Sequence, residues 1–362
     1  MKKNNFVYMD YIDIKGYKSI KDLHLELNPI NILIGANGAG KSNFISFFGF
    51  LKTAYDQLLR VTVAKNGGVD KYLHNGRKNT AKISCKLSFD GGECVYGFTL
   101  DTGVDSFFVL SEMMNEWTAI KGSSSNPELN IKTIGFGGQG SYIRDYLNGL
   151  KVYHFQETGI NSPFNSDPKI NDYHILQSYG ANIASFLYHL KQNDPIIYNR
   201  IVKVIQSIAP YFLDFELKPN TEGSEYIRLA WKDKYSENLY GVTDFSDGTI
   251  RFIALATLFL QPKPPTVIII DEPELGLHPF AINKLAGLVQ AVASKGTQVI
   301  LSTQSVELVN CFSPEDIITV DNIDGVSTFE RLDSKKLAVW LNDYAVGDMW
   351  RQNLLDKGFP NK

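Results

Sequence analysis

The chain has 362 residues, of which 44% are hydrophobic and 21% charged, a composition typical of a folded protein with about two domains. Its 36 Lys and Arg against 39 Asp and Glu give a net charge of −3, which disfavours a nucleic-acid backbone as the main partner but leaves room for a local basic patch. Three cysteines without a Cys-x-x-Cys spacing argue against a disulfide framework and a zinc ribbon, and no apolar run is long enough to span a membrane. These features predict a cytoplasmic protein that does not bind membranes.

The first predicted elements are strands followed by a long helix. Residues 11–17 and 23–27 alternate apolar and polar side chains, as half-buried strands do. Residues 32–34 form an apolar run that is typical of a buried strand. An amphipathic helix that ends by about Lys65 is then predicted from the helical spacing of Phe44, Phe47, Phe48 and Leu51.

A glycine-rich loop joins this strand to this helix and fits the pattern G-x-x-x-x-G-K-[ST]. Its glycines let the backbone N–H groups converge on a phosphate chain, and the helix adds the positive end of its dipole. In this pattern Lys41 reaches the β- and γ-phosphates, and the Ser42 hydroxyl is a ligand of Mg²⁺. We therefore predict a nucleotide-binding loop that consists of Gly35, Ala36, Asn37, Gly38, Ala39, Gly40, Lys41 and Ser42, with Asn43 next to it.

The next segment is predicted to add an antiparallel sheet beside the nucleotide-binding core. Residues 82–89 and 94–100 read as the strands of a hairpin around Asp90-Gly91-Gly92, and residues 107–110 as a third strand. Residues 135–140 match G-x-G-x-x-G, but no strand–helix–strand unit surrounds them. A flexible loop is therefore favoured there over a dinucleotide site.

Helices and strands are expected to alternate through the rest of the chain. The expected helices cover residues 181–190, 195–208 and 279–294. A polar stretch, residues 159–175, is expected to be a loop. The expected strands cover residues 151–155, 215–217, 226–231, 298–301 and 316–320.

Two acidic residues follow a strand that the continuous apolar run of residues 266–270 predicts to be buried on both faces. Asp271 and Glu272 would sit at the carboxyl end of that strand, where ligands bind in open α/β sheets. Asp271 is placed to hold Mg²⁺, and Glu272 to polarise an attacking water as general base. The alternative is a turn followed by a helix cap.

Another polar segment, residues 245–249, precedes an apolar helix. Ser246 is suited to cap that helix, and Gly248 lets the backbone approach an anion closely. Taken alone, these residues indicate only a capped helix.

Four segments together resemble the ATP-binding-cassette ATPases of the SMC, RecF and OLD group: residues 35–42, 245–249, 268–279 and 301–305. The most specific is Asp-Glu-Pro-Glu-x-Gly-Leu-His-Pro in the third. Within the group the chain most resembles short stand-alone predicted AAA-family ATPases of bacteria, over nearly its whole length but only loosely in its middle third. The resemblance implies an α/β fold of the P-loop NTPase type, with a mixed central sheet, an added antiparallel β subdomain and a helical insert.

The resemblance also implies a division into four parts. These are a nucleotide-binding lobe with the phosphate loop and the β subdomain at 1–158, a helical insert at 159–242, the remaining ATPase core at 243–335, and a helical tail at 336–362.

In relatives of this group, two protomers sandwich two ATP molecules head to tail. Each site would combine the phosphate loop, Asp271 and Glu272 of one chain with Ser246 and Gly248 of the other, so that ATP closes a homodimer or higher homo-oligomer. Residues 274–278 would lie along the dimer seam. ATP and Mg²⁺ are the implied cofactors.

The resemblance suggests roles for three further residues. Gln156 resembles the glutamine that links Mg²⁺ to the insert. Lys18 stands where relatives place a basic phosphate contact, although an exposed strand end is an equally good explanation. Gln304 replaces the switch histidine of many cassettes and carries no titratable charge, so slow hydrolysis by a switch rather than a motor is expected.

The favoured function is an ATP-gated dimeric ATPase in DNA-related processes such as anti-phage defence or DNA repair, working with a separate effector. The alternative is the nucleotide-binding subunit of a membrane transporter, which Gln304 and the long insert between Lys41 and Ser246 disfavour. A GTPase is disfavoured because the sequence has no Asn-Lys-x-Asp tetrad.

Two further activities, DNA cleavage and DNA binding, would need residues outside the nucleotide site. The OLD-type relatives carry a nuclease domain after the ATPase, but the residues after Ser302 are too few for one, so we expect no intrinsic nuclease and possibly a nuclease as the effector. DNA binding would use a basic cluster, for which a solvated surface is the alternative: Lys65, Lys71, Arg77, Lys78 and Lys82.

Overall fold

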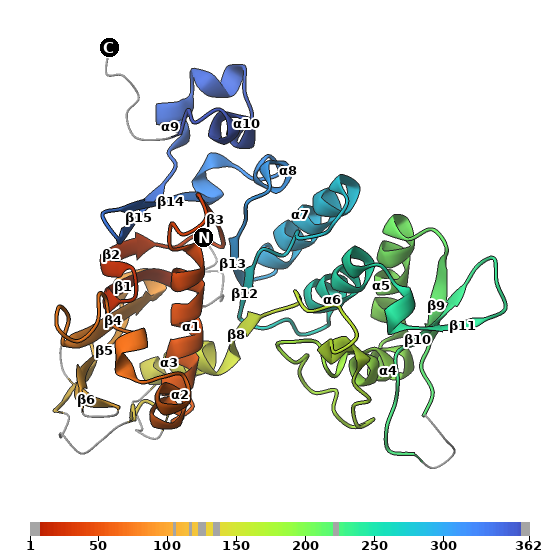
Figure 1. Ribbon diagram of the computed structural model, residues 1–362, viewed down its shortest axis with the longest axis horizontal. Helices are drawn as coiled ribbons and strands as arrows, with labels where there is room; N and C mark the ends of the chain where they lie inside the picture. The colour runs from red at the N-terminus through yellow and green to blue at the C-terminus, as the bar shows by residue number, and fades with distance from the viewer. Residues whose placement is uncertain are drawn as a thin grey trace.

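The computed structural model describes residues 8–103, 106–115, 118–121, 128–132, 138–219 and 224–355. One lobe contains two six-stranded sheets with the helices α1, α2 and α3, and the other contains a three-stranded sheet with α4 and α5 (Figure 1). The helices α6 and α7 lie between these parts (Figure 1). The predicted fold class, an α/β ATPase with a mixed central sheet and an added antiparallel sheet, is confirmed.

The central sheet has the strand order β15-β14-β3-β13-β12-β8 and is parallel except for β15. Its β12 is buried on both faces, as the apolar run predicts, because Ile268 and Ile270 pack into one hydrophobic cluster and Val267 and Ile269 into another. The strands are β3 (Ile30–Ile34), β8 (Leu150–Tyr153), β12 (Val267–Asp271), β13 (Gln298–Ser302), β14 (Ile317–Ile323) and β15 (Val326–Arg331).

The antiparallel sheet has the order β2-β1-β4-β5-β6-β7. The predicted hairpin is confirmed, with Leu87 opposite Tyr96. The first two strands join this sheet, since β1 pairs with both β2 and β4. The strands are β1 (Met9–Tyr17), β2 (Ile20–Glu26), β4 (Lys82–Phe89), β5 (Cys94–Thr102), β6 (Phe107–Met114) and β7 (Thr118–Lys121).

The single long helix predicted up to Lys65 is wrong, because the chain forms α1 (Lys41–Tyr55) and then α2 (Leu59–Lys65). Gln57 has φ 61°, a left-handed conformation that cannot continue an α-helix. The Glu128 carboxylate then accepts hydrogen bonds from the backbone N–H groups of Leu59 (3.0 Å) and Arg60 (3.1 Å), which stabilises the new helix start.

The predicted loop at residues 135–140 lies partly outside the described residues. Its described part, residues 138–140, is the first turn of helix α3 (Gly138–Gly149), so that part of the prediction is wrong. The short 3₁₀ turns of the chain are η1 (Val69–Lys71), η2 (Asp90–Gly92), η3 (Pro163–Asn165), η4 (Val242–Asp244), η5 (Pro314–Asp316) and η6 (Trp340–Asn342).

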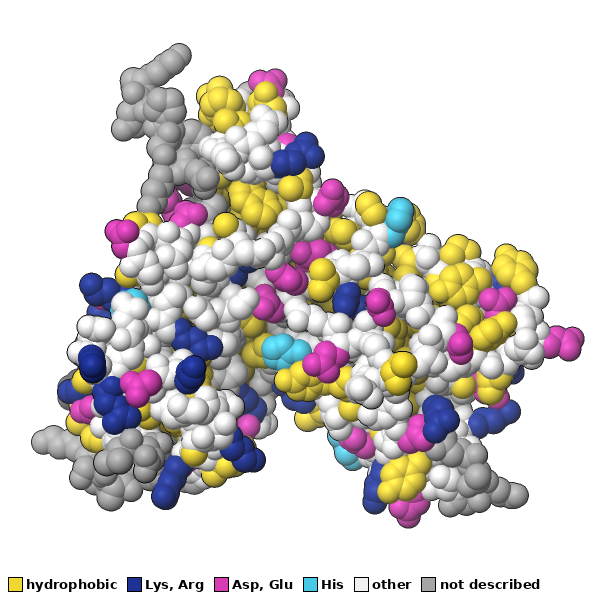
Figure 2. All heavy atoms as spheres, viewed as in Figure 1, with side chains coloured by type: hydrophobic (Ala, Val, Ile, Leu, Met, Phe, Trp, Pro, Cys, Tyr) yellow, Lys and Arg dark blue, Asp and Glu magenta, His cyan; other side chains and the backbone are white. Residues whose placement is uncertain are grey.

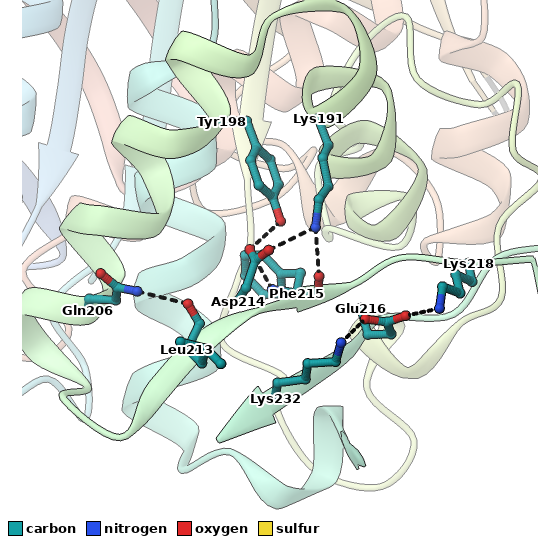
Figure 3. Close-up of polar contacts among 9 residues, drawn as sticks. All are labelled: Lys191, Tyr198, Gln206, Leu213, Asp214, Phe215, Glu216, Lys218 and Lys232. Atoms are coloured by element: carbon teal, nitrogen blue, oxygen red, sulfur yellow. Dashed lines mark hydrogen bonds and ion pairs between the residues drawn. The ribbon is translucent and has the colours of Figure 1, made fainter. Parts of the chain in front are cut away.

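The insert contains the two expected helices and a small sheet of order β11-β10-β9. Two of its acids are paired with lysines (Figure 3): Asp214 accepts from Tyr198 Oη (2.7 Å) and Lys191 Nζ (2.9 Å), and Glu216 pairs with Lys218 and Lys232. The elements are α4 (Ile183–Asn193), α5 (Pro195–Ile208), β9 (Phe212–Glu216), β10 (Ala230–Asp233) and β11 (Leu239–Gly241).

Helix α6 is apolar on nearly all sides because it is packed between α5 and α7. The helices of the last third are α6 (Asp247–Leu260), α7 (Pro279–Ala293), α8 (Val306–Val309), α9 (Ser334–Leu337) and α10 (Val346–Arg351). Across the described ranges, none of the helices combines the length and apolar character needed to cross a bilayer.

Candidate functional site

The phosphate loop follows β3 and turns directly into α1. Gly35 and Gly40 have φ 152° and 117°, which glycine adopts without strain. A Cβ at Gly35 would lie 2.1 Å from the Val320 carbonyl oxygen, and one at Gly40 would lie 1.9 Å from Ser327 Oγ. Both positions therefore require glycine, and the loop is packed closely against β14 and β15.

Lys41 is only 5% exposed and points back into its own loop. Its ammonium donates hydrogen bonds to the carbonyl oxygens of Gly35 (2.6 Å) and Ala36 (3.0 Å). Burial lowers the pKa of Lys41, while the nearby negative charges of Glu272, Asp271 and Glu274 act in the opposite direction. Among the residues that the structure describes, no carboxylate pairs directly with this ammonium, an arrangement that suits a phosphate.

Three acidic side chains, one in the last residue of β12 and two just after it, each accept a hydrogen bond from one of three consecutive residues, 302–304, where β13 ends. The register places Asp271 opposite Ser302, whose hydroxyl donates to the Asp271 carboxylate. The Gln304 side-chain amide donates to the Glu272 carboxylate. The Thr303 hydroxyl donates to Glu274 Oε1 at 2.5 Å. Figure 2 shows acidic side chains gathered between the two lobes.

Gln156 and the predicted acids lie together, as expected for a shared site. The Gln156 side-chain Nε2 donates to the Asp271 backbone oxygen at 3.1 Å, and among the described residues no hydrogen bond to its amide oxygen is present, an oxygen that can bind a cation. The buried Arg251 of α6 holds this segment, donating to the carbonyl oxygens of Phe155 (3.0 Å) and Gln156 (2.9 Å). Burial lowers the pKa of the Arg251 guanidinium.

Ser246 and Gly248 lie at the start of α6. The Ser246 side chain is exposed and caps the helix, accepting a hydrogen bond from the Thr249 N–H at 3.2 Å. A Cβ at Gly248 would lie 2.3 Å from the Gly276 carbonyl oxygen, so glycine permits the contact between α6 and the 272–278 segment. In the described parts of the chain, the Ser246 hydroxyl makes no hydrogen bond to residues 35–42 of its own protomer.

Lys18 lies beside α1, one helical turn beyond Ser42. Its ammonium donates to Ser46 Oγ at 2.8 Å, and burial lowers its pKa. It lines a pocket of about 490 Å³ between α1 and α2. Asn43, also near the loop, donates to Ser19 Oγ at 2.7 Å, next to Lys18 in the chain.

The basic cluster proposed for DNA is partly neutralised. Arg77 lies 3.9 Å from an Asp70 carboxylate oxygen, and Lys82 lies 3.8 Å from one of Asp101. These ion pairs favour a solvated surface there.

Sequence reasoning gave no role inside the site to four residues, one of which, Glu274, it placed only on the expected dimer seam. Ser302, Thr303, Glu274 and Arg251 stand inside or next to the motifs that carry the resemblance, but only Gln304 of the β13 segment was given a role. The signal was present in the run Ser-Thr-Gln, whose three side chains can all donate hydrogen bonds. The acid to which each of these side chains donates depends on the register between β12 and β13, which cannot be read from the sequence.

Comparisons with known proteins give the chain a family. A family model described as "AAA domain, putative AbiEii toxin, Type IV TA system" matches residues 30–310. The Old nuclease of Escherichia phage P2 is 35% identical over 361 residues, covering 85% of this chain and 58% of that protein. The chain thus spans little more than half the length of this relative.

Two other similarities are more limited, one in coverage and the other in sequence identity. The energy-coupling factor transporter ATP-binding protein EcfA of Methanocaldococcus jannaschii is 34% identical over 77 residues, which cover 21% of this chain and 26% of that protein. A crystal structure of the Smc head bound to the C-winged helix domain of ScpA superposes with a TM-score of 0.62 at 16% identity, covering 92% of this chain and 99% of that one. The fold is therefore that of an SMC head, and the chain belongs to the AAA-domain family that the matching family model describes.

Proposed function

We propose that this ATPase binds and hydrolyses Mg²⁺–ATP at an interface between two protomers and acts as a switch. The observation that carries the proposal is the arrangement at the edge of the central sheet. There the phosphate loop, the buried Lys41 ammonium and three acids held by three neighbouring donors all meet at the carboxyl ends of the strands.

We propose that oxygen ligands from three residues hold Mg²⁺ at this edge. We assign the Ser42 hydroxyl, the Asp271 carboxylate and the Gln156 amide oxygen to the metal. No cluster of three or more His, Cys, Asp or Glu side chains that could hold a metal occurs within the described ranges. Mg²⁺ usually binds through one or two carboxylates together with waters and substrate phosphates. When bound, the ion would neutralise charge on the phosphates.

Glu272 is assigned as the general base, which takes the proton of the attacking water. Its backbone has φ 48°, and its N–H donates to the Ser302 carbonyl at 3.0 Å, so the residue turns out of the strand at a fixed point. The Gln304 amide holds its carboxylate. Lys41 and the N–H groups of the loop would bind the β- and γ-phosphates.

The second half of the site is assigned to Ser246 and Gly248 of another protomer. The exposed Ser246 hydroxyl and the start of the 14-residue helix α6 are suited to bind an anion. We propose that this anion is the ATP phosphate bound by the phosphate loop of the other protomer. ATP would therefore close a homodimer or higher assembly, and hydrolysis would release it. The predicted boundaries at residues 158, 242 and 335 stay a prediction.

For the biological role, we propose DNA-related work such as anti-phage defence or DNA repair, through a separate effector. The support is the similarity to the Old nuclease, of which this chain matches only part. We propose that the chain itself has no nuclease activity. The transporter alternative has less support, since the similarity to EcfA covers only 21% of the chain.

Hydrolysis tests this assignment. Glu272→Gln should lower kcat by about 10²–10⁴-fold, because it removes the general base, and should leave ATP affinity nearly unchanged. Phosphate release and ATP binding are measured on the wild type and on this variant. Equal kcat values would remove Glu272 from the mechanism, and a wild type that releases no phosphate would contradict ATP hydrolysis itself.

A further inference from the structure

Glu274 is an acid in the middle of the site to which the mechanism above gives no role. It is 8% exposed. Its Oε1 accepts hydrogen bonds from the Thr303 hydroxyl (2.5 Å) and from the Gln304 backbone N–H (3.2 Å). One oxygen atom therefore fixes two consecutive residues of the segment that follows β13.

Gln304 extends this contact to the general base. Its backbone is held by Glu274, while its side-chain amide donates to the Glu272 carboxylate. Glu274, Gln304 and Glu272 thus form a chain of hydrogen bonds that leads from the buried Glu274 carboxylate to the half-buried Glu272 carboxylate. A base that is oriented by a second group, itself held by a third, is the arrangement found in catalytic triads.

We propose that Glu274 is a positioning residue that fixes Gln304 and, through it, the carboxylate of Glu272 for attack by water. The inference rests on the assignment of Glu272 as general base. Glu274 does not touch the substrate in this account, and it acts only through Gln304.

A packing role alone does not explain an acid at this position. The second oxygen, Oε2, is buried and has no hydrogen-bond partner within the described ranges. A buried polar atom without a partner destabilises the fold, so an apolar side chain would pack there at lower cost. Burial raises the pKa of Glu274, consistent with an acid placed where its charge is poorly solvated. What the acid provides, and an apolar side chain cannot, is the acceptor for Thr303 and Gln304.

The central test is whether the effects of Glu274→Ala and Gln304→Ala on kcat are non-additive. Glu274→Ala should lower kcat by about 10- to 100-fold, because hydrogen bonds in such a chain are strong, and should change ATP affinity by less than about twofold. Gln304→Ala should have a similar effect. The double variant should then be no slower than the slower single variant, because the two residues act as a unit.

A conservative variant separates positioning from charge. Glu274→Gln keeps an amide oxygen that can accept both hydrogen bonds, so its kcat should stay within about threefold of the wild type. If Glu274→Gln is as slow as Glu274→Ala, the charge and not the acceptor matters, and the positioning role is overturned. Effects of Glu274→Ala and Gln304→Ala that multiply in the double variant would overturn it as well.

The contact between Glu274 and Thr303 can also be tested without measuring ATP hydrolysis. Glu274→Ala, Thr303→Val and their combination are compared by denaturant unfolding; the combined change in the unfolding constant should be at least about twofold smaller than the product of the single changes. Independent changes would mean that the contact is not formed. Full activity in Glu272→Gln defeats the assignment of Glu272 as general base instead, while loss of activity there with full activity in Glu274→Ala defeats only the positioning role of Glu274.

Discussion

The insert and the edge of the central sheet use their charged side chains in opposite ways. In the insert, Asp214 and Glu216 are each met by lysine ammonium groups (Figure 3). At the sheet edge, Asp271, Glu272 and Glu274 accept from uncharged hydroxyl and amide groups, although a lysine is near. The Lys41 ammonium donates to carbonyl oxygens instead. Charges in the insert stabilise the fold, and those at the edge remain suited to a ligand.

The pKa shifts of charged groups also differ between the insert and the sheet edge. Hydrogen bonds from Lys218 and Lys232 lower the pKa of Glu216 to about 2. Burial instead raises the pKa of Glu274 and lowers that of Lys41. In the insert the surroundings favour the charged form, whereas at the site they oppose it, as is common where a binding partner supplies the missing charge.

The largest difference between the sheet edge and the insert is expected in ATP affinity when a lysine is removed from each. Lys41→Ala should weaken ATP binding by at least about 100-fold, because each charge-assisted hydrogen bond to phosphate contributes about 1.5–3 kcal/mol. Calorimetric titration with ATP and Mg²⁺ measures this. The matched control is Lys191→Ala in the insert, which should lower stability and leave ATP affinity unchanged. Equal ATP affinity in both variants would remove the distinction between the regions.

A smaller effect is expected from the pH dependence of the insert. The pKa of Glu216 is lowered in the folded protein to about 2 from an ordinary value of 4.5, so its charge adds stability above pH 4.5 that is lost as the pH falls toward 2. Glu216→Gln should be less stable than the wild type by under about 1 kcal/mol at neutral pH, because surface pairs are screened. This difference should vanish near pH 2 in denaturant unfolding; a constant difference would mean that the lysine pairs do not stabilise the fold.

Local patterns predicted the parts of the fold that depend on local physics. The apolar run before Asp271 indicated a strand buried on both faces, and the glycine pattern indicated the loop at Gly35 and Gly40. The break between α1 and α2 could not be predicted in this way, because Gln57 is not a typical helix breaker. The group that stabilises the new start, Glu128, is far away in the sequence.

The site shows the same limit. The individual motifs were recognisable, but the contacts between them follow from strand pairing and helix packing. Thr303 meets Glu274 because β12 and β13 are in register, and Arg251 reaches the Phe155 carbonyl because α6 packs against the segment after β8. Such contacts join residues tens of positions apart, and a single sequence contains no direct record of them.

The central claim is that the phosphate loop is half of a site that Ser246 of another protomer completes. The most direct test is the mass of Glu272→Gln in solution, measured by light scattering with and without ATP. We expect a larger assembly with ATP, such as a dimer, and no such increase when Ser246→Arg is added. If the mass of Glu272→Gln is the same with and without ATP while ATP is bound, the shared site is contradicted.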